Sequence, residues 1–284
     1  MRVSSCFWFL ISARVLPTEA LVLLRRDQLL SLSLKSLFPS VLISSSSSTS
    51  SEGQLDEIVD PASYSGLAYV PNKNDKPPLL VVLHGAGENT LPISNLASIT
   101  GEHAGLPPSL IASARAPREL LDNFAVVAPY SAKKVSFYED PRSRLLSFIT
   151  YAQKELGTDP LNTFLLGFSD GATVALELAT TKRFRAVVLC SSGFSGSLPQ
   201  AALDLLQTTS FWVFHSADDV IFPPTSSDRL VQSLKSVGDP DRVKYTRFER
   251  DPEDLPARVR GHSTGITASK TPATYKWLLS NMII

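Results

Sequence analysis

The sequence of 284 residues is poor in the side chains from which disulfide frameworks and cysteine-based metal sites are made. It has two cysteines, Cys6 and Cys190, too few for a disulfide framework or for a zinc site built on cysteine. Cys190 lies in the apolar run 186–190, so we expect it to be a small core residue. Histidine is also scarce, since the chain has four, and few residues are therefore candidates for imidazole chemistry.

The chain also lacks an excess of charge, because 27 Lys and Arg balance 27 Asp and Glu. Residues 1–51 hold five basic and two acidic groups, whereas the remainder holds 22 basic and 25 acidic groups, a net charge of −3. A mildly acidic body gives no electrostatic basis for binding nucleic acid. The apolar run at 6–11 is far shorter than the ~20 residues of a membrane-spanning helix, so we expect no stable membrane span.

Residues 1–51 form a low-complexity segment that is rich in leucine and serine and carries an uninterrupted serine run at 44–48. Such a run cannot bury enough surface to offset chain entropy, which indicates a linker or targeting segment. The arginine- and serine-rich, acid-poor composition favours an organelle transit peptide, for a plastid or a mitochondrion. A secretory signal and no targeting role are the alternatives, which correspond to a secreted or a cytoplasmic protein.

Short apolar runs alternate with helical patterns from residue 62 onward, which predicts one α/β domain over 62–284. Runs that are apolar on both faces and rich in Val, Leu and Phe are typical of parallel strands buried between layers of helices. The expected strands lie at 64–70, 79–83, 124–128, 163–166, 186–190, 211–214 and 243–248. Strands that alternate with helices imply right-handed crossovers and a mainly parallel sheet with helices on both faces.

The helical patterns lie between these runs. Asp140 and Pro141 predict a helix start. The apolar positions that follow it share one helix face and are Leu145, Ile149, Ala152 and Leu156. Further helices are expected at 172–179, at 230–237 and around Trp277.

The strand expected at 163–166 leads into the pattern Gly167-Phe168-Ser169-Asp170-Gly171. G-x-S-x-G between a strand and a helix is typical of a nucleophile elbow. The turn strains the serine backbone and exposes its hydroxyl, while Gly167 and Gly171 avoid collisions. The pattern is short enough to arise by chance in a turn, but the strand before it and the helix after it make Ser169 the candidate nucleophile.

A serine nucleophile needs a base, and the base needs an orienting acid; after such an elbow they follow in the order serine, acid, histidine. Of the four histidines, two follow Ser169: His215 and His262. His215 precedes the acidic pair Asp218-Asp219 and so cannot follow an acid in that loop. His262 is therefore the candidate base, and its competing interpretation is an exposed loop histidine.

A glycine-rich bend, His84-Gly85-Ala86-Gly87-Glu88, follows the strand expected at 79–83. Such a bend can turn a backbone N–H toward a developing oxyanion. We expect the N–H groups of Ala86 and Asp170 to form this oxyanion hole, with Gly85 and Gly87 supporting the bend. His84 is expected to shape the bend through hydrogen bonds to backbone, and Glu88 either organises the loop or is exposed.

These stretches together resemble the serine-esterase branch of the α/β-hydrolase superfamily, with its carboxylesterase/phospholipase, dienelactone-hydrolase-like and prolyl-oligopeptidase-like members. The matching pieces run through most of residues 64–280 and are 69–71, 80–88, 105–108, 126–129, 167–171, 215–223 and 261–262. The resemblance implies an α/β-hydrolase fold and Asp219 as the acid, with Ser169 and His262 as its partners. Ile221 and Phe222 are then expected to be buried beneath the loop and to hold Asp219, with Asp218 facing solvent or capping the turn.

Two features depart from the family pattern. Ser216 stands where the family usually has glycine, which is a mild change. The charged stretch 251–260 directly precedes His262, and it either reshapes the substrate entrance or is a solvated insertion. The body is near the minimal size for the fold, so we expect an open site and no large cap domain.

The expected activity is acyl transfer through an acyl-enzyme, with a small-molecule ester or thioester as substrate and without a metal or cofactor. Acyl-protein thioesterase activity and a peptidase that acts on short peptides are alternatives with the same machinery. The alternative from another class is a non-catalytic, ligand-binding protein with a hydrolase fold.

Overall fold

The computed structural model describes residues 54–72, 75–87, 92–98, 104–133, 135–194 and 196–283. All described residues belong to one compact unit, residues 49–284. The segment predicted at 1–51 and the loop residue Glu88 lie outside the described residues, so the expectations for them stay predictions.

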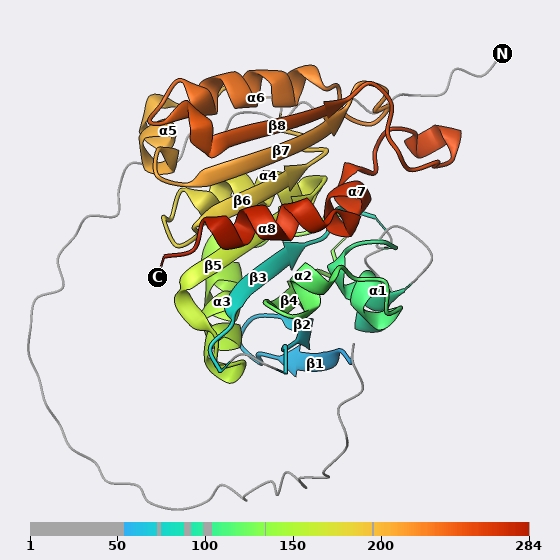
Figure 1. The fold of residues 1–284 in the computed structure, drawn as a ribbon, viewed down its shortest axis with the longest axis vertical. Coiled ribbons are helices and arrows are strands. Elements are labelled where there is room, and N and C mark those ends of the chain that lie inside the picture. The colour runs from blue at the N-terminus through green and yellow to red at the C-terminus, as the bar shows by residue number, and fades with distance from the viewer. Residues whose placement is uncertain are drawn as a thin grey trace, which may run out of the picture. The chain divides into compact units, whose positions relative to one another are not determined.

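An eight-stranded sheet forms the centre of the fold (Figure 1), with the strand order β1-β2-β4-β3-β5-β6-β7-β8. The pairs β1–β2 and β2–β4 are antiparallel, and every pair from β4 to β8 is parallel. The strands are β1 (Asp56–Val59), β2 (Ser65–Tyr69), β3 (Pro78–Leu83), β4 (Ala125–Pro129), β5 (Asp159–Phe168), β6 (Ala186–Cys190), β7 (Ser210–Ser216) and β8 (Val243–Phe248). The predicted mainly parallel sheet is confirmed.

Helices cover both faces of the sheet, as predicted. The α-helices are α1 (Pro107–Ala112), α2 (Arg118–Leu121), α3 (Arg142–Glu155), α4 (Asp170–Ala179), α5 (Gln200–Leu206), α6 (Thr225–Lys235), α7 (Thr264–Lys270) and α8 (Pro272–Ser280). Three short 3-10 helices are η1 (Ile93–Ala97), η2 (Pro240–Arg242) and η3 (Ala257–Val259). Side chains of α3, α4, α5 and α6 join one hydrophobic core, and side chains of α1, α2, α7 and α8 join the other. These elements include no large cap domain.

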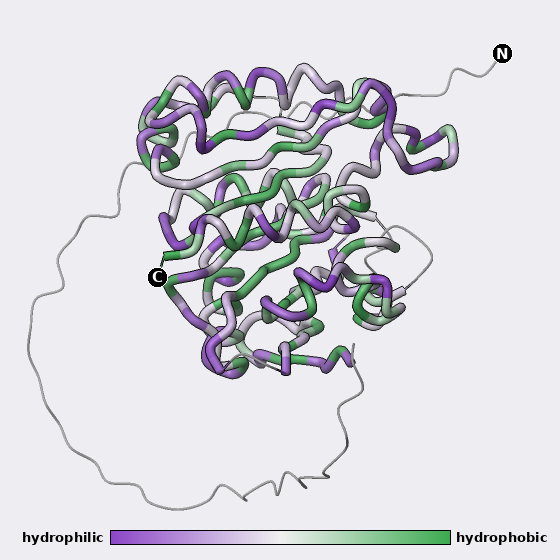
Figure 2. Tube along the Cα trace, viewed as in Figure 1, coloured by the Kyte–Doolittle hydropathy of each residue, from purple (hydrophilic) through white to green (hydrophobic). Residues whose placement is uncertain are grey.

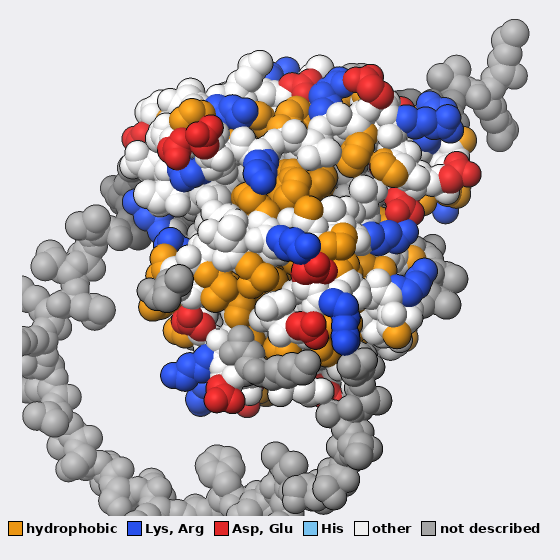
Figure 3. Space-filling model, in the orientation of Figure 1, with side chains coloured by type: hydrophobic (Ala, Val, Ile, Leu, Met, Phe, Trp, Pro, Cys, Tyr) orange, Lys and Arg blue, Asp and Glu red, His pale blue; other side chains and the backbone are white. Residues whose placement is uncertain are grey.

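The two cores exist because buried strands direct alternate side chains to opposite faces. In β3, Leu79, Val81 and Leu83 belong to one core, whereas Leu80 and Val82 belong to the other. The central strands are accordingly the most continuously apolar part of the trace (Figure 2). On the face shown in Figure 3, basic and acidic side chains are interspersed among apolar ones. None of the helices among the described residues is long and apolar enough to cross a bilayer.

Two strands differ most from the sequence-based expectation. β1 was not predicted, because it has four residues of which Ile58 alone is buried, and so short an edge strand has no readable period. β5 begins at Asp159, four residues before the predicted start, because its exposed first residues carry no apolar pattern. The apolar part of β5 leads directly into Ser169, so its end fixes the position of the candidate nucleophile.

Candidate active site

Ser169 lies in the tight connection between β5 and α4, where its backbone adopts φ 56° and ψ −121°. This conformation is costly for any residue with a side chain. It is held in place by a hydrogen bond from the Ser169 N–H to Cys190 O, 2.9 Å long. The first turn of α4 also packs tightly on β3, because a Cβ atom at Gly171 would lie 2.3 Å from Leu83 O. The close approach explains why glycine is needed two residues after the serine.

The structure brings Ser169, His262 and Asp219 into one hydrogen-bonded line. In the sequence, Ser169 lies 93 residues from His262, and Asp219 lies 43 residues from His262. Ser169 Oγ lies 2.9 Å from His262 Nε2, and His262 Nδ1 lies 2.8 Å from Asp219 Oδ2. The Asp219 side chain is fully buried, and the His262 side chain is 10% exposed. A carboxylate, an imidazole and a hydroxyl in this order can pass a proton from the hydroxyl to the imidazole.

Asp219 follows β7 and is held by the backbone of its own loop. Its Oδ1 accepts hydrogen bonds from the N–H groups of Ile221, at 2.8 Å, and Phe222, at 2.9 Å. Burial by itself raises the pKa of Asp219, but hydrogen bonds from His215 and His262, the charge of His262 and the Phe222 N–H outweigh it. The pKa of this carboxyl therefore falls well below its ordinary value, and Asp219 is ionised.

The expectation that Ile221 is buried beneath this loop is wrong. Ile221 is 44% exposed, and Val220 beside it is exposed as well. Both N–H groups used by Asp219 belong to the turn itself, so the backbone holds the carboxylate and the Ile221 side chain turns outward. Phe222 is half-buried and packs edge-on against the His262 ring, with the ring centroids 5.3 Å apart.

Asp218 makes contacts different from those of Asp219 and does not reach His262. Its Oδ1 accepts from Ser216 Oγ, at 2.6 Å, and from the Asp251 N–H, at 3.0 Å. Asp251 in turn accepts from the Ser263 N–H, at 3.0 Å, next to His262. The two carboxylates therefore connect the β7 loop to the charged stretch 251–260 and fix both ends of that stretch.

The His262 loop also packs directly on the Asp219 loop through backbone atoms. Gly261 adopts φ +75°, and a Cβ atom there would lie 2.3 Å from Asp218 C and 2.4 Å from Asp219 N. The Val220 N–H donates to Arg260 O at 3.0 Å. Glycine at position 261 is thus required both by its backbone conformation and by the contact that sets the position of His262 against Asp219.

The glycine-rich bend after β3 lies against Ser169. A Cβ atom at Gly85 would lie 2.9 Å from the Ser169 Cβ, and Ala86 and Gly87 follow, each partly exposed. His84 is buried, and its ring bonds to backbone: Nδ1–H donates to Gly85 O at 2.7 Å, and Nε2 accepts from the Ser131 N–H at 3.1 Å.

Two further titratable groups lie near Ser169. Asp170 begins α4, and burial raises the pKa of its carboxyl, with the charge of His262 opposing this shift. Cys190 is fully buried, and burial likewise raises the pKa of its thiol. No group of three or more His, Cys, Asp or Glu side chains among the described residues could hold a metal ion.

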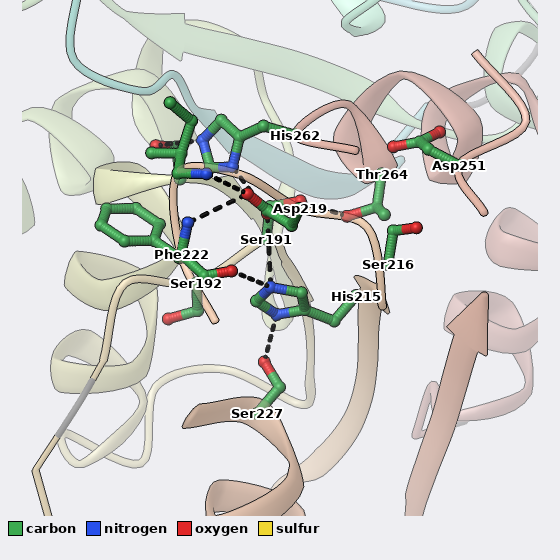
Figure 4. Close-up of polar contacts among 12 residues, drawn as sticks. Ser191, Ser192, His215, Ser216, Asp219, Phe222, Ser227, Asp251, His262 and Thr264 are labelled. Carbon is green, nitrogen blue, oxygen red and sulfur yellow. Dashed lines mark hydrogen bonds and ion pairs between the residues drawn. The ribbon is translucent and has the colours of Figure 1, made fainter. Parts of the chain in front are cut away.

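One residue at the site, His215, is not among the site residues predicted from the sequence. Its ring is fully buried, and Nε2 lies 3.3 Å from Asp219 Oδ2 (Figure 4). Its place before the acid excludes His215 as the base, and in the structure it is His262 that contacts Ser169. The overlooked signal is its place at the end of an apolar strand four positions before Asp219, from which a turn brings the two side chains together.

Comparisons with known proteins relate this geometry to a family. The family model described as phospholipase/carboxylesterase matches residues 66–258, a range that includes Ser169 and Asp219 and ends before His262. No curated protein matches the chain.

Solved structures are similar to the chain in fold. A thermostable esterase is 22% identical with a TM-score of 0.59; the match covers 81% of this chain and 63% of the esterase. The chain thus spans less than two thirds of that protein. MGS-M1, an α/β hydrolase from a Medee basin deep-sea metagenome library, is 18% identical with a TM-score of 0.54, over 81% of this chain and 98% of MGS-M1.

FphF, a fluorophosphonate-binding serine hydrolase of Staphylococcus aureus, is 14% identical with a TM-score of 0.53, over 80% of this chain and 97% of FphF. At these identities the structures support the fold alone. The family model, in contrast, matches more than half of the chain, and the chain therefore belongs to the phospholipase/carboxylesterase family.

Proposed function

We propose that the protein is a serine hydrolase that cleaves carboxylic esters through an acyl-enzyme, with Ser169 as nucleophile, His262 as base and Asp219 as orienting acid. The observation that carries the proposal is the hydrogen-bonded line from Asp219 Oδ2 through His262 to Ser169 Oγ, with contacts of 2.8 and 2.9 Å. The strained strand-to-helix turn supports it, because backbone strain concentrates at functional residues.

In the proposed reaction, Ser169 Oγ attacks the ester carbonyl while His262 Nε2 takes the hydroxyl proton. The N–H groups of Ala86 and Asp170 stabilise the oxyanion, a contribution of about 10²–10³ in rate for one donor. His262 then gives its proton to the leaving alcohol as the carbon–oxygen bond breaks. Water, activated by the same imidazole, hydrolyses the acyl-enzyme and releases the acid. Asp219 keeps the His262 proton on Nδ1 throughout, so Nε2 is free to accept.

A fluorophosphonate probe tests the proposal directly. The probe reacts with activated serines, so we expect stoichiometric labelling of the folded protein, with the adduct located by mass spectrometry on the peptide that contains Ser169. p-Nitrophenyl acetate should be hydrolysed by the same preparation, with the label abolishing turnover. A folded protein that neither takes the label nor turns over the ester would favour the non-catalytic, ligand-binding alternative.

Matched substrates separate the three enzymatic alternatives. An oxygen ester, a thioester with the same acyl group and a dipeptide amide can be compared by kcat/KM. We expect the oxygen ester to have the highest kcat/KM of the three substrates. A thioester that is preferred by more than about tenfold, which is 1.4 kcal/mol in barrier, would instead identify a thioesterase. A preference for the amide would identify a peptidase of short peptides.

The pH dependence of kcat/KM should show a single ionisation on its acid limb. A histidine base is active as neutral imidazole, so the rate should rise with pH and then level off. Asp219 adds no second step, because its pKa lies below the ordinary carboxyl value of about 3.9 and the group stays charged above that pH. The measurement is log kcat/KM from about pH 5 to 9, with an expected limiting slope of one; a profile flat from about pH 5 to 8 would count against His262 as the base.

Gly261→Ala should lower kcat/KM by about a hundredfold, because a displacement of about 1 Å in a site can have that effect. The added Cβ would lie 2.3–2.4 Å from backbone of Asp218 and Asp219, so the His262 loop must shift. Gly157→Ala is the matched control, since Gly157 has φ +63° and an added Cβ there meets nothing within 4 Å. The control isolates the cost of the positive φ. Equal kinetics for the two variants would contradict the proposed packing role.

A further inference from the structure

Asp219 is contacted by two histidines, and the proposed reaction uses one of them. His262 and His215 approach the carboxylate from different sides (Figure 4). Both reach the same oxygen: His262 Nδ1 lies 2.8 Å from Asp219 Oδ2, and His215 Nε2 lies 3.3 Å from it. His215 is fully buried near the end of β7, so it cannot touch a substrate.

The partners of the His215 ring determine where its hydrogen lies. Nε2 is within 3.1 Å of Phe222 O and 3.3 Å of Asp219 Oδ2, and a carbonyl and an ionised carboxylate both only accept. Nε2 must therefore carry hydrogen and donate to this pair of acceptors. The other ring nitrogen, Nδ1, lies 2.7 Å from Ser227 Oγ on α6, a hydroxyl that can donate or accept, and this contact holds the ring plane in place.

With His215 included, the acceptor sites of the Asp219 carboxylate are filled. Oδ1 accepts from the N–H groups of Ile221 and Phe222, and Oδ2 accepts from His262 Nδ1. Oδ2 also lies 3.3 Å from His215 Nε2, whose N–H it shares with Phe222 O. A carboxylate offers about four lone-pair sites, so four donors in four directions prevent its rotation. Each donor also takes a share of the negative charge and leaves less of it to attract a proton on His262.

We propose that His215 is a positioning residue, which holds Asp219 at the orientation that His262 needs and limits how strongly Asp219 attracts the His262 proton. The inference rests on the proposed function of Ser169, His262 and Asp219. Among the described residues, the ionisable groups that bear on the His262 imidazole are Asp219 from the β7–α6 loop and Asp170 from the start of α4. His215 acts on His262 through the first of these.

Two substitutions at position 215 distinguish donation to Asp219 from mere packing. His215→Gln places an amide N–H near the position of Nε2 and so keeps a donor toward Asp219 and Phe222. His215→Asn is shorter, and its amide lies near the position of Nδ1, which serves Ser227 and leaves Asp219 without the donor. Both variants remove the imidazole, so a difference between them reports on the lost hydrogen bond.

For His215→Asn we expect kcat to fall about tenfold, the effect of one hydrogen bond to a charged group, with KM unchanged. The midpoint of the acid limb of the pH–rate profile should also move up by roughly half a pH unit. Without the His215 donor, Asp219 keeps more of its negative charge and stabilises protonated His262 more strongly. His215→Gln should keep kcat within about threefold and leave the midpoint in place. A His215→Asn enzyme with unchanged kcat and midpoint would overturn the inference, as would equal losses in both variants with a fixed midpoint.

If His215→Asn does not fold, Ser227→Ala tests whether His215 positions Asp219. It removes the hydrogen-bond partner of His215 Nδ1 and frees the ring to turn away from Asp219, so kcat should fall about threefold at constant KM. Ser226→Ala is its control, because Ser226 is a buried neighbour on α6 that is not among the partners of the His215 ring. Equal activity in these two serine variants would overturn the inference.

The outcome for the unmodified protein separates this inference from the proposed function. If that protein takes no fluorophosphonate label and hydrolyses no ester, the proposed function fails. If it is active and the variants at positions 215 and 227 behave like it, the function stands and the role of His215 fails.

Discussion

Replacing Ser169 with alanine is expected to reduce ester turnover by about 10⁴-fold or more and to leave the fold intact. Ser169 Oγ has His262 Nε2 as its partner at 2.9 Å, and in the proposed reaction it is the atom that attacks. Alanine keeps the Cβ and adopts the same backbone conformation at the same cost. Purified Ser169→Ala protein should therefore show an unchanged melting temperature, no fluorophosphonate adduct and no turnover above background.

Ser169→Gly separates loss of the hydroxyl from disturbance of the turn. Glycine adopts φ 56° and ψ −121° more readily than any residue with a side chain. The glycine variant should be as inactive as the alanine variant and at least as stable, as measured by thermal unfolding. If either variant kept the turnover of the unmodified protein, another residue would be the nucleophile.

Asp219→Asn is the second change expected to have a large effect, a loss of about 10⁴-fold as in serine proteases. The reason lies in the donors around the carboxylate. The N–H groups of Ile221 and Phe222 face Oδ1, so the asparagine carbonyl oxygen must take that place and its NH₂ must take the place of Oδ2. The NH₂ then points at His262 Nδ1, which has to give up its hydrogen. The imidazole hydrogen moves to Nε2, and Ser169 loses its base.

Asp218→Asn is the matched control for this change. The Asp218 carboxylate accepts from Ser216 Oγ and from the Asp251 N–H, both at Oδ1, and an amide oxygen can accept both bonds equally well. We expect a loss below about tenfold, or 1.4 kcal/mol in barrier. Measuring kcat/KM of both variants with one ester decides the assignment. A larger loss for Asp218→Asn, or a sensitive Glu249 or Asp251, would show that Asp219 is not the acid.

The sequence predicted the parts of the fold whose side chains are apolar throughout. β3 was found because all six of its residues are buried, and α3 because its buried residues recur at helical spacing. β1 could not be found, since its pairing with β2 through Asp56–Val59 depends on backbone bonds at the sheet edge rather than on side-chain pattern. Patterns of hydrophobicity indicate which side chains are buried, but they do not indicate backbone pairing of a strand at the sheet edge.

The residues of the candidate site could be predicted where the order of motifs along the chain identifies them. They could not be predicted where the conformation of a turn sets the direction of a side chain. Ser169 and His262 followed from a motif and from the small number of histidines, and their contact is present in the structure. Asp219 was implied by resemblance alone. The contact of His215 with Asp219, and the outward direction of Ile221, depend on how the loop after β7 reverses. No periodicity in the sequence specifies that reversal.

Gly261 packs on Asp218 and Asp219, and the Val220 N–H bonds to Arg260 O. These contacts limit how the two loops can be exchanged between related proteins. The loop that carries the acid and the loop that carries the histidine are complementary surfaces, so neither can be exchanged or lengthened without the other. Ser169 stands on a separate turn between β5 and α4. A chimaera that takes residues 216–222 and 250–263 from one relative would transfer a matched acid–histidine module, whereas a crossover between them would combine halves that do not fit.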